Sequence, residues 1–259
     1  MDRRFKGKII TTLVLCICIV LGLIYLTIKR AINAKNEVKP TPTITATIEP
    51  TKTPISSPTP LPTPTPVIYD PESDESLFRI VNENQQIDKD YVPTNLVKID
   101  SSLISVNFSH ELRTDAYEAL KDLYRKALEA GYKMRILSGY RSYTEQQQLF
   151  DFYVSKYGKE WAEQIDDKPG ESEHQLGLCI DVGLPSGECD LDSCFANSGL
   201  YLWLHENAYK YGFIERYPEG KQSVTGIIYS PWHYRYVGKD VAEKIYIFGL
   251  TMEEFFENQ

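Results

Sequence analysis

The chain has 259 residues and a formal net charge of −8. Residues 1–39 hold eight Lys or Arg and two Asp or Glu, so the rest of the chain holds 20 basic and 34 acidic side chains. Phosphate binding needs a basic surface, and this charge balance excludes nucleic acid as the expected partner. The length fits one domain of average to large size together with additional segments.

The N-terminal segment predicts a membrane anchor. Residues 9–28 are uncharged and mostly apolar, and a helix of about 20 residues spans the roughly 30 Å of a bilayer core. A cleaved signal peptide has a shorter apolar run and a small-residue cleavage site, and Ile32 disrupts the spacing of Ala31 and Ala34. Basic residues flank both ends, so charge alone does not decide the orientation. We expect a cytoplasmic tail at 1–8, a retained anchor at 9–28 and an extracytoplasmic remainder. The protein would then be a single-pass protein of the cell membrane.

Residues 29–72 predict an extended linker. Pro and Thr dominate residues 39–67, and repeated Thr-Pro steps favour polyproline II geometry over a helix. At about 3.1 Å per residue, this run would reach up to roughly 90 Å. Such a spacer would carry the domain at 73–259 away from the membrane and into a thick cell wall. A disordered tail without function is the alternative.

The first part of that domain alternates helical and strand patterns. Apolar side chains recur at helical spacing within 112–132, and Gly131 is a stop signal for this helix. The short apolar run 134–138 predicts a strand. Thr144 and Gln147 form a capping-box pattern for the next helix.

The second part of the domain predicts short strands among turns. Ser198 is placed to cap a helix that continues to Tyr211. We expect strands at 213–214, 226–229 and 233–237, and a closing helix at 240–248. Helices come first and strands cluster later, so the sequence predicts an α+β domain with a small, mostly antiparallel sheet that holds the functional site.

Two histidines and one acid form a pattern typical of a metal site. His174 and Asp181 lie seven positions apart in SEHQLGLCID, and His233 follows in PWHYRY, 52 residues after Asp181. Seven positions are too many for one helix face, so we expect His174 in a loop and Asp181 in a strand at 178–182. Two His and one carboxylate hold a catalytic zinc and leave its fourth position open. Ordinary polar residues are the alternative, and Asp181 could instead orient a histidine.

Three strings of the sequence together resemble one enzyme family. SEHQLGLCID resembles the S-x-H-x-x-G-x-A-x-D signature of the VanY-type zinc D-alanyl-D-alanine carboxypeptidases, with Cys179 in place of the usual Ala. PWHYRYVG is similar to E-P-W-H-x-R-Y, and SGYRSYTEQ is similar to S-G-Y-R-S-x-x-x-Q. The resemblance covers residues 77–250. It implies the fold shared with the Hedgehog signalling domain, Zn2+ as cofactor, and peptidoglycan stem peptides as substrates.

The resemblance also implies a role for each matching residue. The two histidines and the aspartate are then the zinc ligands. Arg141 is expected to bind the free C-terminal carboxylate of the substrate, which a guanidinium can hold through two parallel hydrogen bonds. Ser138 and Gln146 are expected to be lesser substrate contacts. A surface arginine without function is the alternative for Arg141.

Position 230 departs from the family pattern. The family has its catalytic Glu three residues before the second zinc histidine, where this chain has Ser230. A Ser hydroxyl cannot serve as a base near neutral pH without an activating base of its own. Glu171, Glu173 and Glu215 are possible substitutes that the sequence does not place at the metal.

Two functions therefore remain open at this point. The first is a zinc carboxypeptidase that removes a terminal D-alanine from stem peptides, slowly unless another acid substitutes at position 230. The second is a catalytically impaired family member that acts as a peptidoglycan-binding or regulatory module. A structural domain without metal is a weaker third alternative.

The cysteines predict one disulfide in the domain. Cys189 and Cys194 close a short loop, and a disulfide is favoured there outside the cell. A metal site is the alternative, but no His lies nearby. Cys179 is expected to be unpaired in the core.

Overall fold

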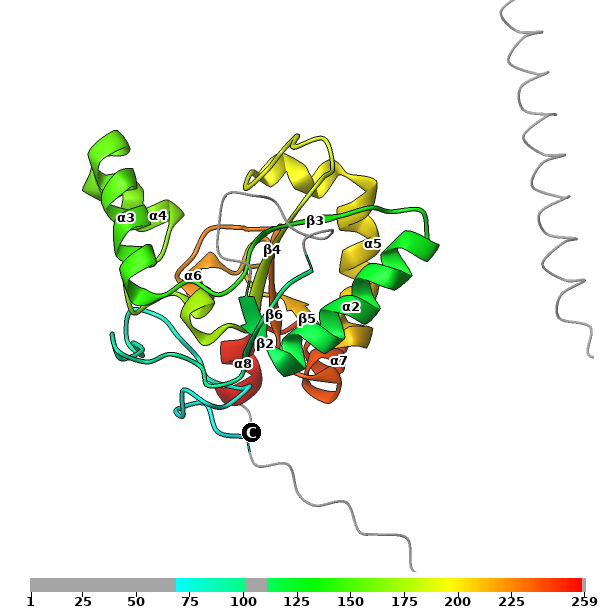
Figure 1. Cartoon of the computed structure of the whole chain (residues 1–259), viewed down its shortest axis with the longest axis horizontal. Helices are drawn as coiled ribbons and strands as arrows, with labels where there is room; N and C mark the ends of the chain where they lie inside the picture. Colours follow the sequence, from blue (N-terminus) through cyan, green and yellow to red (C-terminus); the bar gives the residue numbers. More distant parts are fainter. Residues whose placement is uncertain (1–68, 101–110, 258–259) are drawn as a thin grey trace, which may run out of the picture. The chain divides into compact units, whose positions relative to one another are not determined.

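The computed structural model describes residues 69–100 and 111–257 of the chain (Figure 1). The predicted tail, the anchor and nearly all of the predicted linker lie outside these residues. Within the two described ranges, no helix has the length and apolar character that a membrane span requires.

A four-stranded antiparallel sheet lies at the centre of the fold. Its strand order is β3 (Arg135–Ser138), β4 (Cys179–Gly183), β6 (His233–Tyr236) and β5 (Phe213–Glu215). A separate antiparallel ladder joins β1 (Leu96–Lys98) to β2 (Glu111–Arg113). These small antiparallel sheets with surrounding helices confirm the predicted α+β class.

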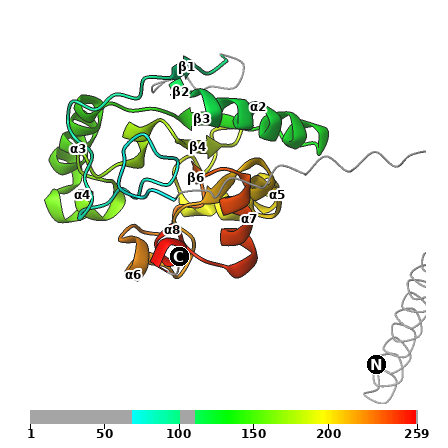
Figure 2. The ribbon, with the colours of Figure 1, turned by 90° about the horizontal axis from the view of Figure 1, so that it is seen from below.

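Helices lie around the central sheet (Figures 1 and 2). They are α2 (Thr114–Glu129), α3 (Tyr143–Tyr157), α4 (Lys159–Ile165), α5 (Gly199–Asn207), α6 (Gln222–Thr225), α7 (Lys239–Phe248) and α8 (Met252–Glu257). Three 3₁₀ turns are η1 (Glu173–Leu176), η2 (Ser193–Asn197) and η3 (Ala208–Tyr211). Both views show α3 and α4 together at one side of the domain, away from α2, α5 and α7.

The main core lies between the sheet and the helices α2 and α5. Leu120 and Leu123 of α2 pack in one buried cluster with Ile180 of β4 and Leu204 of α5. All five residues of β4 are buried, as expected for a central strand covered on both faces. The backbone that carries Asp181 is therefore held inside the core rather than at its edge.

The helix start at α3 differs from the prediction by two residues. Ser142, not Thr144, is the N-cap, and its side chain accepts a hydrogen bond from the Glu145 backbone N–H. The Glu145 carboxylate in turn accepts a hydrogen bond from the Ser142 backbone N–H at 2.8 Å. The sequence contains both capping-box patterns, and the earlier one is used because Ser142 has the extended backbone that an N-cap needs.

The predicted strand at 226–229 is wrong. Gly226 ends α6 in a left-handed conformation, and the chain then runs without regular structure to Ser230. The Ser230 backbone N–H donates to the Tyr217 carbonyl at 3.0 Å, so this segment is held by a loop contact rather than by a strand. Its apolar residues Ile227 and Ile228 line a cavity instead of a sheet face. The helices α4, α6 and α8 and the strands β1 and β2 were not predicted.

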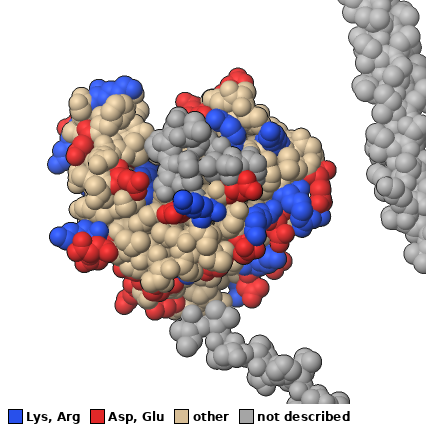
Figure 3. Space-filling model, in the orientation of Figure 1, with Lys and Arg blue, Asp and Glu red and all other residues tan. Residues whose placement is uncertain are grey.

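The described charges are mixed on the face shown in Figure 3. Lys and Arg side chains are interspersed with Asp and Glu around a largely uncharged surface. Several of these charges pair along α2, including Arg125 with Asp122 and Glu129.

Candidate functional site

Three neighbouring strands bring predicted site residues into one row. The register pairs Asp181 of β4 with His233 of β6, and Ser138 of β3 with Asp181. Directly opposed residues of antiparallel strands have side chains on the same face, about 5 Å apart. Residues 138, 181 and 233 are distant in sequence, so the sheet register alone makes them neighbours.

His174 completes this group from the turn η1, just before β4. Gly177 ends η1 with a φ of +65°, and a Cβ at this position would lie 2.9 Å from the Leu96 side chain. The positive φ, which residues with a side chain rarely adopt, favours glycine where the chain turns from His174 into the buried strand. His174 Nε2 lies 3.2 Å from Asp181 Oδ2, and His233 Nδ1 lies 3.0 Å from Asp181 Oδ1.

The protonation of His174 suits a metal ligand. Its Nδ1 lies 2.7 Å from the Gly139 carbonyl oxygen, which can only accept, so Nδ1 carries the proton. Burial lowers the pKa of His174, which favours the neutral ring that binds a metal. The pKa of Asp181 lies well below its usual value, because the two histidines outweigh the opposing effect of burial. His174 Nε2 and a carboxylate oxygen of Asp181 face each other at 3.2 Å, an arrangement that fits a cation bound by both.

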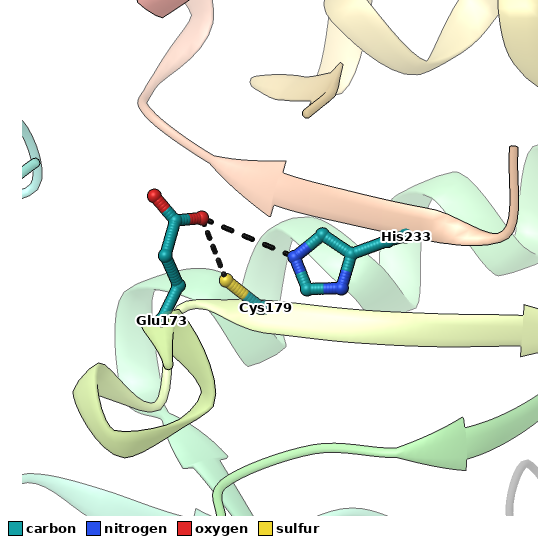
Figure 4. Close-up of side chains that lie close together, drawn as sticks. All are labelled: Glu173, Cys179 and His233. Atoms are coloured by element: carbon teal, nitrogen blue, oxygen red, sulfur yellow. Dashed lines mark hydrogen bonds and ion pairs between the residues drawn. The ribbon is translucent and has the colours of Figure 1, made fainter. Parts of the chain in front are cut away.

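A second buried group shares His233 with the first. It comprises Glu173, Cys179 and His233 (Figure 4). The Cys179 thiol donates to Glu173 Oε2 at 3.4 Å, and His233 Nε2 lies 3.9 Å from the same oxygen. Figure 4 shows the Glu173 carboxylate at the Nε2 side of the His233 ring. The other ring nitrogen, Nδ1, lies 3.0 Å from Asp181 Oδ1.

This second group does not suit a metal ion. Glu173 is fully buried, and one of its oxygens pairs with Arg216 Nε and Arg235 Nη1, each at 2.8 Å. The two guanidiniums outweigh burial and hold the pKa of Glu173 well below its usual value. Burial raises the pKa of Cys179 to about 11, so the thiol stays protonated and is a poor ligand. Glu173 is better suited to orient the His233 ring, as carboxylates near metal-binding histidines do.

A cavity of about 600 Å³ opens over the first group. His174, Asp181 and His233 line it together with Ser138 and Arg141. Another wall comes from α3 and α4, whose lining side chains are largely aromatic: Leu149, Tyr153, Tyr157, Trp161 and Ile165. The cavity is large enough for a peptide segment beside the candidate metal ligands.

Arg141 lines this cavity and carries two buried donor atoms without a hydrogen-bond partner. Its side chain is only 10% exposed, and its Nε and Nη1 have no hydrogen-bond partner among the described residues. Nη2 donates to Ser138 Oγ at 3.5 Å, and Nη1 lies 3.9 Å from Asp166 Oδ1. Buried donors without partners are costly, so this guanidinium is arranged for a ligand with acceptor oxygens, such as a carboxylate.

Gln146 is placed differently from the prediction. It is buried, it does not line the cavity, and its side-chain amide donates to the Asp167 carbonyl oxygen. The structure gives it a role in holding the loop after α4, not in contacting a substrate.

Ser230 does line the cavity, but nothing activates its hydroxyl. The Oγ–H donates to the Ile228 carbonyl oxygen at 2.9 Å, and no acid or histidine bonds to it among the described residues. Its side chain therefore acts as a local loop contact.

None of the three predicted substitutes for the missing Glu lies on the cavity. Glu171 accepts from the Gln86 side chain and lines a neighbouring, smaller cavity. Glu215 lies 3.0 Å from His205 Nδ1 and lines a third cavity. Glu173 does not line the cavity either, and its carboxylate is paired with Arg216 and Arg235.

Two acids that line the cavity, Asp166 and Asp167, were not predicted as site residues. They follow α4 directly and precede the Lys-Pro-Gly loop that leads into η1. Adjacent acids just before the histidine-bearing string were a visible signal, but nothing local distinguished them from solvated loop residues.

Cys189 and Cys194 form a disulfide in the structure, and Cys179 is free and buried. The disulfide loop borders the cavity through Leu191, Asp192 and Ser193. Asp192 caps η2 by accepting a hydrogen bond from the Cys194 backbone N–H at 2.8 Å. The loop is thus both closed covalently and capped where it meets the cavity rim.

The chain matches known proteins over the same residues that build this site. The family model of VanY, D-alanyl-D-alanine carboxypeptidase, matches residues 109–239. The Bacillus subtilis (strain 168) protein YodJ is 40% identical over 193 residues, which are 72% of this chain and 69% of YodJ.

Two solved structures are also similar. The LdcB LD-carboxypeptidase has 39% identity and a TM-score of 0.65, over 71% of this chain and 87% of that chain. The vancomycin-resistance D,D-pentapeptidase VanY, solved as a mutant in complex with Zn(II), has 34% identity and a TM-score of 0.59, over 70% of this chain and 99% of that chain. The family match spans half of the sequence and contains every strand of the central sheet. The chain therefore belongs to the VanY family of D-alanyl-D-alanine carboxypeptidases and is a carboxypeptidase enzyme.

Proposed function

We propose that this protein is a zinc-dependent peptidoglycan carboxypeptidase that removes a terminal D-alanine from stem peptides. One observation carries the proposal. A two-histidine, one-carboxylate group and an arginine with unpaired donors line the same cavity, so one substrate can present its terminal carboxylate and its scissile bond together. A similar structure, the VanY D,D-pentapeptidase, contains Zn(II), which supports the choice of metal.

Each group has a defined part in the hydrolysis. Zinc held by His174, Asp181 and His233 would supply Lewis-acid polarisation of the scissile carbonyl and of a water molecule. Arg141 holds the terminal carboxylate through Nε and Nη1, neither of which has a hydrogen-bond partner among the described residues. Ser138 accepts a hydrogen bond from the same guanidinium and so limits its orientation. Fixing the terminus in this way places the last peptide bond, rather than an internal one, at the reacting centre.

Metal binding gives the first test. Replacing His174, Asp181 or His233 by Ala removes one of three protein ligands, so each variant should lose more than about 100-fold in zinc affinity. This loss is larger than the one that follows when a residue that only hydrogen-bonds a metal ligand is replaced. Competition with a chromophoric chelator measures this affinity. Zinc retained in stoichiometric amount by all three variants would exclude this ligand set.

The substrate gives the second test. A domain of residues 73–259 with zinc should release D-alanine from a defined pentapeptide or tetrapeptide muropeptide, observed by mass spectrometry as the loss of one alanine residue. Comparing peptides that end in D-Ala-D-Ala with peptides that end in L-Lys-D-Ala separates DD- from LD-specificity.

A peptidoglycan-binding or regulatory function is the second candidate, favoured by Ser230 at the position of the family's Glu. Full zinc occupancy with peptide binding, but without D-alanine release over hours, is the outcome expected for it.

The N-terminal sequence supports a cell-membrane location. The apolar run 9–28 would anchor the chain as a single pass, and the Pro- and Thr-rich run at 29–72 would present the enzyme to the cell wall. The full chain should then sediment with membranes, whereas a chain that lacks residues 1–30 should stay in the supernatant. Equal sedimentation of both would argue against the anchor.

A further inference from the structure

Peptide hydrolysis at this site needs a proton acceptor that Ser230 cannot supply. The attacking water must lose a proton, and the leaving nitrogen must gain one. The Ser230 hydroxyl already donates to a backbone carbonyl and lies beside no base. A carboxylate that faces the cavity is the simplest replacement.

Four described acids line the cavity, and three of them have other roles. Asp181 is a candidate metal ligand. Asp166 lies 3.9 Å from Arg141 Nη1, and its Oδ1 accepts a hydrogen bond from the Asp167 backbone N–H at 3.0 Å. Asp192 is exposed at the rim and caps η2.

Asp167 is the fourth acid, and its carboxylate is uncommitted. Among the residues that the structure describes, this carboxylate forms no hydrogen bond and no ion pair, while its backbone is fixed on both sides. The Asp167 N–H donates to Asp166, and its carbonyl oxygen accepts from the buried Gln146 amide. Asp167 lines the same cavity as His233 and Ser230, and it also lines the neighbouring smaller cavity.

We propose that the Asp167 carboxylate accepts the proton of the attacking water and so replaces the glutamate that is absent at position 230. This inference rests on the proposed carboxypeptidase function. It also gives the Gln146 contact a purpose, because that amide holds the loop that presents Asp167.

The electrostatic surroundings of Asp167 support this role. Burial, the adjacent Asp166 and more weakly Glu173 raise the pKa of Asp167 to about 7, while His233 and Arg141 act in the opposite direction. Tyr217 lines the same cavity, and burial and the charge of Asp167 together raise its pKa. A base whose pKa lies near the working pH transfers protons most effectively.

The proton and bond changes balance with water as the only co-substrate. The water oxygen forms a bond to the scissile carbonyl carbon as one of its protons moves to Asp167. The carbon–nitrogen bond then breaks, and Asp167 returns the proton to the leaving nitrogen. The products are the shortened stem peptide, with a new carboxylate, and free D-alanine.

The test compares Asp167→Asn with a matched control, Glu171→Gln, which changes a nearby acid outside this cavity. Asp167→Asn should lower kcat by about 10²–10⁴-fold, the usual contribution of general base catalysis, with zinc affinity and peptide affinity unchanged. Glu171→Gln should leave kcat unchanged. Adding Ser230→Glu to Asp167→Asn should restore much of the lost rate, because it returns a carboxylate to the family position.

A second readout does not depend on activity. Carboxyl-carbon NMR of the metal-free protein, with labelled aspartate, should show a resonance that titrates well above an ordinary aspartate and is absent from Asp167→Asn. The resonance of Asp166, whose pKa burial also raises, should persist in that variant. Titration of Asp167 near its ordinary value would contradict the proposal.

The activity outcomes separate this inference from the function on which it rests. Wild-type release of D-alanine with an unaffected Asp167→Asn variant would overturn the role of Asp167 and leave the carboxypeptidase function intact. Release only after Ser230→Glu would also overturn it, because the wild-type site would then lack a base. No release by wild type, Ser230→Glu or the double variant would contradict both proposals.

Discussion

His233 links two clusters through the two nitrogens of one ring. Nδ1 faces Asp181 at 3.0 Å, and Nε2 faces Glu173 at 3.9 Å. A histidine that binds a metal through one nitrogen is commonly oriented by a carboxylate at the other. The fully buried Glu173 would be an isolated charge without Arg216 and Arg235, so these arginines maintain the carboxylate that faces His233 Nε2.

The Glu173 contact predicts an effect on the metal. Glu173→Gln should weaken zinc binding by about 10–100-fold, the typical cost of losing an outer partner of a ligating histidine. Glu253→Gln is the matched control, because Glu253 also pairs with Arg216 but does not reach His233. Zinc titrations of both folded variants check the prediction, and equal losses in the two would assign the effect to Arg216 instead.

Arg141 predicts selectivity for a free terminus. Arg141→Ala should weaken binding of peptides with a C-terminal carboxylate by about 1.5–3 kcal/mol, the usual value for a hydrogen bond to a charged group. Peptides amidated at the C-terminus should bind wild type and variant alike. Calorimetry with the two peptide forms measures the difference, and a matching loss for both forms would mean that Arg141 does not bind the terminus.

At the scale of elements, α3 and α4 extend the site beyond the reacting centre. Arg141 lies two residues before α3 begins, and Tyr153 and Tyr157 follow one helical turn apart on the cavity side. At 1.5 Å per residue, Tyr157 lies about 21 Å along the helix from the first residue of α3. Tyr157 and Trp161 are substantially exposed, with ring centroids 5.9 Å apart. This wall is available to the part of a substrate remote from its terminus.

The α3–α4 wall predicts an effect that depends on substrate length. Tyr157→Ala should lower kcat/KM for a muropeptide that carries its sugars, because an aromatic contact of about 0.5–1.5 kcal/mol is lost. It should leave the D-Ala-D-Ala dipeptide unaffected, since a dipeptide is too short to reach that turn. Phe152→Ala, an exposed change on α3 outside the cavity lining, is the control. Equal losses on both substrates would indicate a folding defect.

At the scale of the whole molecule, one chain of ion pairs joins the C-terminal helix to the site. Glu253 of α8 pairs with Arg216, Arg216 pairs with Glu173, and Glu173 lies against His233. The buried side chains Met252 and Phe255 pack α8 against α7 and β5 in the same region. The position of a candidate metal ligand thus depends on elements that line no part of the cavity.

These ion pairs predict a loss of stability in acid. The arginines hold the folded-state pKa of Glu173 well below its ordinary value of 4.5. A group with a lowered folded pKa stabilises the protein above its unfolded pKa, and this contribution is lost as the pH falls below that value. The free energy of unfolding of the metal-free protein, measured with urea, should therefore fall from pH 6 to pH 3. Glu173→Gln should lower stability at pH 6 and flatten this dependence. An unchanged slope would assign the acid sensitivity to other carboxylates.

The sequence by itself determined the features that depend on local spacing and side-chain chemistry. Residues close together along the chain produce the periodicity of α2 and α7 and the strand patterns around Asp181 and His233. The metal-ligand pattern could be recognised because the chain contains few histidines. Each could be recognised without coordinates because helix and strand periods, and the preferences of metals for ligands, hold in any fold.

Only the tertiary structure decided which polar groups face the cavity. Gln146 turned inward to hold a loop, residues 226–229 formed no strand, and the acid that faces the cavity without a partner was Asp167 rather than any of the predicted glutamates. Glu173 is adjacent to His174 in sequence, yet its role is set by Arg216, 43 positions away. Burial, ion pairing and sheet register act between residues distant in sequence, so no local pattern contains them.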